Sequence, residues 1–195
     1  VRLGEHNLNE ETGTEQEITA NKVIFHPQWD ILTKDTSQGP KVISTYDMML
    51  VELKEPARIT QQVYPICLKG ESFEPGKMCH VAGWGNEKVH GPVHSTLHEA
   101  AIPVVTPEEC NKPESYSGVI TEDLVCAGFQ QGGRDTCEGD SGGPLMCQGD
   151  DKKWYIAGVA SFGHTECGAA NKYGIYARIA STREWITNNT GINFL

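Results

Sequence analysis

Residues 135–145 read Asp-Thr-Cys-Glu-Gly-Asp-Ser-Gly-Gly-Pro-Leu and set one serine, Ser141, among three glycines. Glycine lets a backbone turn sharply because it has no Cβ, and a sharp turn exposes the side chain at its tip. The turn also leaves backbone N–H groups uncovered near the serine oxygen, and Gly139 and Ser141 are the expected donors. Such donors stabilise the oxyanion of a tetrahedral intermediate. The stretch therefore predicts a nucleophilic serine beside an oxyanion hole.

The shorter pattern Gly-x-Ser-x-Gly within this stretch is ambiguous by itself. It occurs in ordinary glycine-rich turns, and it also fits the nucleophile elbow of α/β-hydrolases. An α/β-hydrolase needs its histidine after both the serine and the acid in the chain. Only His164 follows Ser141, and no parallel βαβ pattern lies between them. The α/β-hydrolase interpretation is therefore rejected.

The composition indicates a β-rich protein. A chain of 195 residues suits one large domain or two small lobes, and its 21 glycines and 10 prolines favour short strands joined by turns. The net charge of −10 argues against nucleic acid or an anionic membrane as the main partner. The chain has no apolar run long enough to span a membrane and no signal-peptide pattern, and it opens on Val1. We expect a mature chain or a fragment.

The cysteines indicate an oxidising compartment. There are seven, and none belongs to a Cys-x-x-Cys pair of the kind that binds zinc. A secreted protein with a disulfide framework is the expectation. Because the count is odd, at least one thiol is free or pairs outside this chain.

Several stretches together resemble the trypsin-like (chymotrypsin-family) serine proteases. Besides the serine loop and its two flanking cysteines, they are residues 47–53, 63–68 and 79–85. The resemblance covers essentially the whole chain. It implies an all-β fold of two six-stranded antiparallel β-barrels, the first truncated at its N-terminus, with a C-terminal α-helix.

The resemblance also divides the chain, which it treats as one incomplete protease domain over residues 1–195. The remainder of the first barrel spans residues 1–66, and the connection and second barrel span residues 67–180. The helix is expected at about 181–190, because Ser181 and Glu184 have capping-box spacing and Gly191 can end it.

Other segments are interpreted locally. Residues 18–25, 48–53, 97–105 and 154–161 are expected to be strands, and the strand that follows Asp47 is expected to be buried. The polar segment from Asp30 to Thr45, which contains Gly39-Pro40, is expected to be a surface loop.

The implied activity is peptide-bond hydrolysis by a serine, a histidine and an aspartate. The resemblance assigns Ser141 as nucleophile and Asp47 as the residue that orients the histidine. Family order places that histidine before Asp47, in an Ala-Ala-His-Cys context that neither His6 nor His26 has. We therefore expect the base to lie outside this chain, and this polypeptide, made alone, neither to fold well nor to cleave substrates. The alternative function is a non-catalytic protease homologue that serves as a binding or regulatory module.

The resemblance also assigns substrate specificity. Asp135 corresponds to the base of the primary specificity pocket, and a carboxylate there favours Arg or Lys before the scissile bond. Ser161 corresponds to the residue whose backbone supports the substrate. Gly163 and Gly174 correspond to positions at the pocket entrance, where they leave room for a long basic side chain.

Activation and disulfide pairing follow from the same resemblance. Asp140 is expected to pair with the α-amine that activation cleavage releases. Cys67 is expected to bond to an upstream segment or light chain. The other six cysteines are expected to form the pairs Cys79–Cys147, Cys110–Cys126 and Cys137–Cys167. Protein substrates and protease inhibitors are the expected partners, and the expected location is extracellular.

Cations are a further expectation, although none is required for the chemistry. The acidic loop after residue 4 resembles the calcium loop of trypsin-like proteases, but Thr12 stands where trypsin carries an acid, which lowers the expected affinity. Its candidate ligands are Glu5, Asn7, Glu10 and Glu15. Tyr173 precedes Gly174, and a tyrosine there often accompanies sodium dependence in the family.

Three further histidines, His90, His94 and His98, are spaced four residues apart. With no cysteine or aspartate nearby, we interpret them as solvated side chains on an exposed loop, not as metal ligands.

Overall fold

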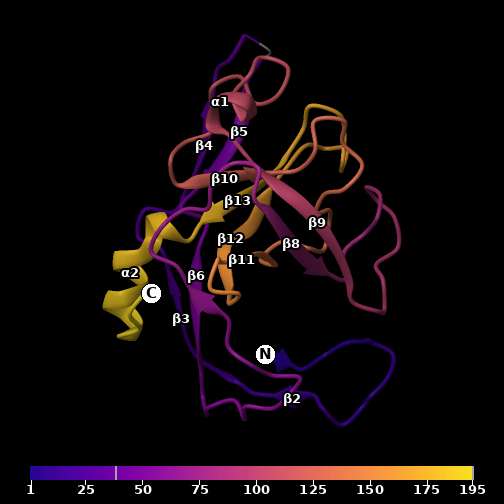
Figure 1. Ribbon diagram of the computed structural model, residues 1–195, viewed down its shortest axis with the longest axis vertical. Helices are drawn as coiled ribbons and strands as arrows, with labels where there is room; N and C mark the ends of the chain where they lie inside the picture. The colour runs from indigo at the N-terminus through magenta and orange to yellow at the C-terminus, as the bar shows by residue number, and fades with distance from the viewer. Residues whose placement is uncertain (38, 195) are drawn as a thin grey trace.

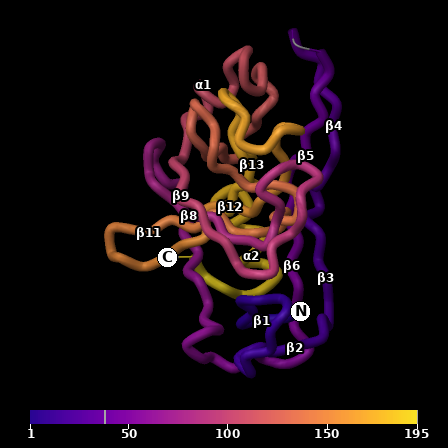
Figure 2. Tube along the Cα trace, turned by 90° about the vertical axis from the view of Figure 1, so that its right-hand side faces the viewer, coloured from indigo at the N-terminus to yellow at the C-terminus, as the bar shows by residue number. Residues whose placement is uncertain are grey.

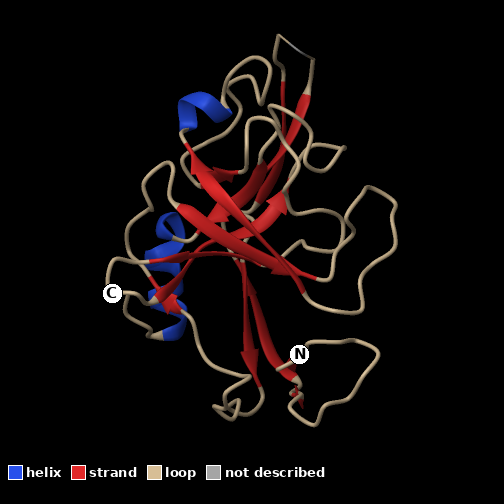
Figure 3. Ribbon diagram, turned by 45° about the vertical axis from the view of Figure 1, so that its right-hand side comes forward, coloured by secondary structure: helices blue, strands red, loops and turns tan. Residues whose placement is uncertain are grey.

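The computed structural model describes residues 1–37 and 39–194, which form mostly short strands (Figures 1 and 3). Its central feature is a closed antiparallel barrel with the strand order β11-β8-β9-β10-β13-β12, closed by pairing of β11 with β12. Its strands are β8 (Met78–Gly83), β9 (His98–Val105), β10 (Leu124–Ala127), β11 (Pro144–Gln148), β12 (Trp154–Phe162) and β13 (Gly174–Arg178). The short β7 (Cys67–Leu68) runs parallel to β12. The expected second barrel is therefore confirmed.

The barrel interior is filled by apolar side chains that alternate with outward-facing residues. Ile102, Leu145 and Tyr176 are completely buried there. A disulfide between Cys79 and Cys147 joins β8 to β11 at directly paired positions. Gly158 is required on β12, because a Cβ at this position would lie 2.7 Å from the Cβ of Tyr176.

The N-terminal half forms three separate two-stranded sheets instead of a closed barrel. They are β1 (Arg2–Leu3) with β2 (Gln16–Glu17), β3 (Ala20–Phe25) with β6 (Met49–Leu53), and β4 (Asp30–Lys34) with β5 (Lys41–Thr45). Figure 2 shows β3 and β4 as an extended strip along one side of the molecule.

Two expectations about this half were wrong. Residues 30–45 were expected to be a surface loop, but residues 30–34 and 41–45 pair as the two strands of a hairpin, with Leu32 opposite Ile43. Its apolar residues occur singly among polar ones, so the strand pattern was weak. The strand after Asp47 was expected to be buried, yet Met49 and Val51 are exposed, because this strand, β6, pairs only with β3 among the described residues.

The helices are short. The first, α1 (Pro107–Cys110), begins after Thr106, whose Oγ1 accepts a hydrogen bond from the Glu109 N–H at 3.0 Å. The second, α2 (Arg183–Thr190), follows the 3₁₀ turn η1 (Ala180–Thr182) and ends at Gly191, which has φ 70° and donates its N–H to Thr187. No helix among the described residues is long and apolar enough to cross a membrane.

The C-terminal helix lies where the sequence predicts it, but its expected capping box is not formed. Ser181 instead donates its hydroxyl to the Glu122 carbonyl at 3.1 Å. The buried face of α2 is centred on Ile186, which packs with Met48 and Ile179. The helix therefore packs on the segment that carries Asp47 as well as on the second barrel.

Candidate active site

Ser141 is exposed at the tip of a tight turn between the barrel strands. Gly143 closes this turn by donating its N–H to the Asp140 carbonyl at 2.9 Å, and Gly142 donates to the Ala160 carbonyl on β12 at 2.8 Å. Gly139 and Gly142 have φ values of 95° and 82°, which residues with a Cβ rarely adopt. Among the described residues, the N–H groups of Gly139 and Ser141 have no acceptor. They are therefore free to donate hydrogen bonds to a ligand oxygen.

Asp140 is held by two backbone amides of this chain. Gly85 donates to its Oδ1 at 2.9 Å and Cys137 donates to its Oδ2 at 3.0 Å. The α-amine of Val1 donates instead to the Ile18 carbonyl at 2.8 Å. The expected pairing of Asp140 with an activation amine stays a prediction.

Asp47 is connected to the second barrel by a side-chain hydrogen bond. The hydroxyl of Ser161 on β12 donates to Asp47 Oδ2 at 2.5 Å. This bond joins residues 114 positions apart in the chain. It fixes one carboxylate oxygen of Asp47 beside the cavity that Ser161 lines.

The residue before Asp47 is held in an unusual conformation. Tyr46 has φ 46°, a left-handed value that is uncommon for a residue other than glycine. Its N–H donates to Asp123 Oδ2 at 2.8 Å, and its ring stacks on His26 with 4.7 Å between centroids. Asp123 is itself buried and also accepts from the Thr121 hydroxyl. Sequence reasoning missed Asp123, because it is far from Asp47 in the chain and belongs to no motif.

Ser141, Ser161 and Asp135 line one cavity of about 180 Å³. The carboxylate of Asp135 accepts hydrogen bonds from the N–H groups of Thr136 at 2.8 Å and Gly168 at 3.2 Å. Burial raises the pKa of Asp135 to about 6, although these two amides act in the opposite direction. The cavity is therefore lined by the exposed hydroxyl of Ser141 and by the partly desolvated carboxylate of Asp135.

The two glycines that were expected at the cavity entrance differ in position. Gly163 lines the cavity, and a Cβ there would meet nothing within 4 Å. Gly174 instead lies against the acid, because a Cβ there would be 2.5 Å from Asp135 Oδ1 and 2.9 Å from the Tyr176 hydroxyl. Gly174 thus provides space next to the carboxylate itself.

Comparison with known proteins agrees with this geometry. The trypsin family model matches residues 1–186. This chain belongs to the trypsin family. Trypsin-3 of Salmo salar is 37% identical over 194 residues, which are 99% of this chain and 74% of that protein. Trypsin of Sus scrofa is 36% identical over 194 residues, or 99% of this chain and 76% of that protein.

A third relative has a different overall organisation. Transmembrane protease serine 11E of Mus musculus is 42% identical over 149 residues, which are 75% of this chain. The match spans only 35% of that longer protein. Membership of the family thus establishes a trypsin-like serine protease domain.

The disulfides of this trypsin-family chain are the three that the resemblance implies, Cys79–Cys147, Cys110–Cys126 and Cys137–Cys167. Cys137 lies in the serine loop, so its bond to Cys167 joins that loop to the segment between β12 and β13. Cys67 is half-buried and carries a free thiol.

The loop expected to bind calcium does not gather its acidic groups in this trypsin-family structure. Glu15 accepts from the Thr12 N–H, the Thr12 hydroxyl and the Gly13 N–H, and these bonds lower its pKa to about 2. Glu5 forms an ion pair with Arg2 at 2.7 Å. Within residues 1–37 and 39–194, Glu5, Glu10 and Glu15 do not form a convergent acidic group. Calcium binding by this loop stays a prediction.

Tyr173, the residue on which sodium binding was predicted, is buried. Its hydroxyl donates to Glu109 Oε1 at 3.1 Å, and burial raises its pKa to about 12. Its carbonyl accepts from the Tyr116 hydroxyl at 2.6 Å. Sodium dependence stays a prediction.

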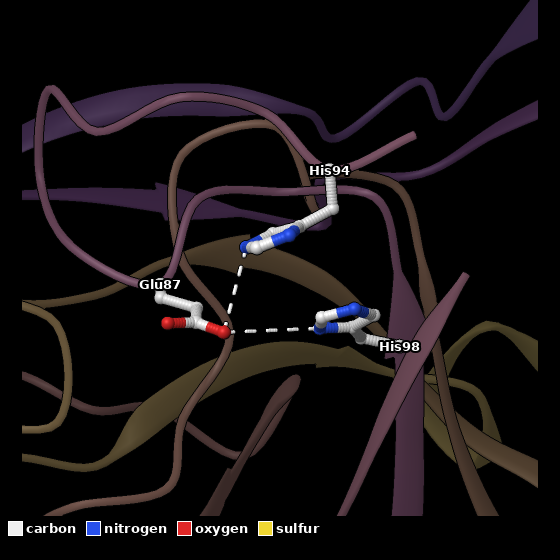
Figure 4. A group of neighbouring side chains, drawn as sticks. All are labelled: Glu87, His94 and His98. Carbon is white, nitrogen blue, oxygen red and sulfur yellow. Dashed lines mark ion pairs between the residues drawn. The ribbon is translucent and has the colours of Figure 1, made fainter. Parts of the chain in front are cut away.

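His94 and His98, which the sequence predicted to be solvated side chains, are 28% and 50% exposed and both form ion pairs with Glu87. Together with Glu87 they form the one group of three potential metal ligands found within residues 1–37 and 39–194 (Figure 4). The third histidine, His90, lies apart from them and pairs with Glu138 at 3.5 Å. The sequence did contain a signal, because Glu87 precedes His94 by seven residues and His98 by eleven. The three side chains meet only because the loop between β8 and β9 folds back on itself.

Proposed function

We propose that this protein is an endopeptidase that cleaves after Arg or Lys through an acyl-enzyme intermediate. One observation carries the proposal: the cavity lined by Ser141 and the acid Asp135 is also lined by Ser161, which binds Asp47. A nucleophile, a histidine-orienting carboxylate and a cation-binding carboxylate are thereby grouped around one cavity.

The chemistry follows from these positions. A serine hydroxyl attacks a carbonyl carbon effectively only when a base removes its proton. We propose that an imidazole from a segment outside these 195 residues is that base and that Asp47 orients it. The proton then passes to the leaving amine, and water releases the acyl group from Ser141 by the reverse steps. The free N–H groups of Gly139 and Ser141 would donate hydrogen bonds to the oxyanion of the tetrahedral intermediate.

Substrate preference is assigned to Asp135. An ionised carboxylate is costly in a narrow, partly desolvated cavity, as the raised pKa of Asp135 indicates. A guanidinium or ammonium group bound beside it would offset that cost. Aliphatic or aromatic side chains offer no such compensation, so the cavity favours Arg and Lys.

The test uses the full-length protein after activation, with peptidyl-arginine and peptidyl-phenylalanine amides as substrates. We expect turnover of the arginine substrate, abolished by Ser141→Ala. We expect Asp135→Ser to reduce kcat/KM for arginine by roughly 100-fold or more, because the cation would lose its buried partner. Unchanged arginine preference in Asp135→Ser would disprove the assignment of Asp135, while turnover by Ser141→Ala would disprove the mechanism.

A second candidate is a non-catalytic homologue that binds proteins in the same cavity. It would apply if the segment expected to supply the histidine carried another residue in its place. The same assay separates the two functions. A full-length protein that binds a peptidyl-arginine ligand but never cleaves it would be a binding module.

We further propose that the protein acts outside the cell and that Cys67 bonds to an upstream segment or light chain. Three disulfides support an oxidising compartment, and the Cys67 thiol has no partner cysteine among the described residues. Peptide mapping of the secreted protein without reduction should find Cys67 linked to a peptide outside this sequence. Cys67 linked to another cysteine of these 195 residues would contradict this.

A further inference from the structure

The cluster of Glu87, His94 and His98 lies outside the cavity that Ser141 lines. Glu87 and His94 belong to the loop between β8 and β9, and His98 is the first residue of β9. Figure 4 shows both imidazoles pointing toward the same oxygen of Glu87. That Oε1 atom lies 3.5 Å from His94 Nε2 and 3.9 Å from His98 Nδ1. One ligand atom from each of the three residues lies within 4.8 Å of the others.

These separations approach those of a tetrahedral zinc site. Zinc binds histidine nitrogen and carboxylate oxygen at about 2.0–2.2 Å, so neighbouring ligands of a tetrahedral ion are separated by about 3.4 Å. Small side-chain rotations would close the remaining difference. Two imidazoles and one carboxylate are a donor set that zinc takes in proteins, whereas calcium and magnesium prefer oxygen donors alone.

The cluster is also accessible. The side chain of Glu87 is 70% exposed, that of His98 50% and that of His94 28%. An ion can therefore enter from solvent, and a water molecule can supply the fourth ligand. The two histidine rings already stack with 4.2 Å between their centroids, so the loop need not fold to bring them together.

We propose that Glu87, His94 and His98 form a Zn²⁺ site, a function separate from that of the serine cavity. A bound ion would attach the loop between β8 and β9 to the first residue of β9, His98. The other end of this loop is already bound to the serine loop, because Asn86 and His90 donate their N–H groups to Glu138 at 2.8 Å. Glu138 directly precedes Gly139, so the ion would hold the loop that borders the candidate oxyanion donors.

Calorimetric titration of the folded, disulfide-bonded protein with ZnCl₂ tests the site. The Ser141→Ala background prevents self-cleavage during the measurement. We expect one zinc per chain, and we expect His94→Ala and His98→Ala each to weaken binding by at least 10- to 100-fold. Loss of an outer partner of a metal ligand typically costs that much, and loss of a ligand should cost no less.

His90→Ala is the matched control, because His90 lies on the same loop but outside the cluster. It should bind zinc as the unsubstituted protein does. Absence of zinc binding at millimolar concentration would overturn the proposal. So would equal affinity in all three histidine variants, which would place the ion elsewhere.

A second measurement depends neither on calorimetry nor on the activity of the protein. Lys88 is exposed and is the only lysine or arginine of residues 84–97, so added trypsin should cut the loop after it. Zinc should slow this cut at least several-fold in the His90→Ala variant and leave it unchanged in His94→Ala. An equal effect of zinc on both variants would mean that it acts on the added enzyme or at another site, and the proposal would fail.

Discussion

The carboxylate of Asp123 accepts a hydrogen bond of 2.8 Å from the backbone N–H of Tyr46, a residue 77 positions earlier in the chain. Tyr46 has φ 46°, a conformation that costs on the order of 1–3 kcal/mol in a residue with a side chain. The next residue is Asp47. Asp123 therefore acts as a positioning residue, because it stabilises the backbone that presents Asp47 to Ser161.

Replacement of Asp123 tests this role. Asp123→Ala leaves the Tyr46 N–H without its acceptor, which should lower the free energy of unfolding by about 1–3 kcal/mol. Displacement of Asp47 should also lower kcat roughly 10- to 100-fold with little change in KM. Asp123→Asn should restore most of kcat, because its amide oxygen can still accept from Tyr46. An equal loss in both variants, or a loss confined to KM, would contradict the role.

Ser161→Ala removes the only side-chain donor that the described structure gives to Asp47. Hydrogen bonds to charged groups contribute about 1.5–3 kcal/mol, so kcat should fall roughly 10- to 100-fold. Binding of an arginine ligand should change little, because the Asp135 carboxylate has its own donors, Thr136 and Gly168. Steady-state kinetics and ligand titration of the same variant separate the two effects.

The titration of Asp135 should make the free energy of unfolding depend on pH. Its pKa is raised from 3.8 to about 6, so its contribution to stability is fully present below pH 3.8 and is lost as the pH rises through about 6. The loss amounts to about 3 kcal/mol. Asp135→Asn should therefore gain stability relative to the unsubstituted protein between pH 4 and about 6. Urea unfolding across this range measures the difference, and a constant difference would contradict the raised pKa.

Two alanine substitutions distinguish the two glycines near Asp135. Gly174→Ala places a Cβ 2.5 Å from Asp135 Oδ1, so the carboxylate must move and arginine binding should weaken at least tenfold. Gly163→Ala meets nothing within 4 Å and should fold with unchanged stability. Titration with an arginine amide and thermal unfolding provide the comparison. Equal behaviour of the two variants would show that the space beside Asp135 is not needed.

The parts of the fold that the sequence predicted are those with dense local signals. The glycine-rich turn around Ser141 carried the family resemblance, and that resemblance implied the second barrel and pairs such as Cys137–Cys167. The position of α2 followed from Gly191, whose left-handed conformation ends the helix.

The parts that it missed depend on contacts between distant segments. The hairpin of β4 and β5 is stabilised by cross-strand pairing, and only Ile43 among its apolar residues is fully buried. Asp123 contacts Tyr46 through a single hydrogen bond, and a single bond between distant residues produces no periodic pattern in the sequence. The grouping of His98 with Glu87 depends on the return path of a loop, which residue spacing alone does not determine.

The segment that carries Asp47 is attached to the second barrel on both sides. Ile43 packs into the cluster around Tyr116 and Tyr173, and Met48 packs against Ile186 of α2. The strand β3, which pairs with the strand after Asp47, has no residue in the buried clusters, and its Phe25 faces solvent. Local opening of β3 should precede any movement of the acid. The segment around Asp47 can therefore keep its contacts with the second barrel while residues 20–25 open. Amide exchange should be slower at residues 43–48 than at residues 20–25.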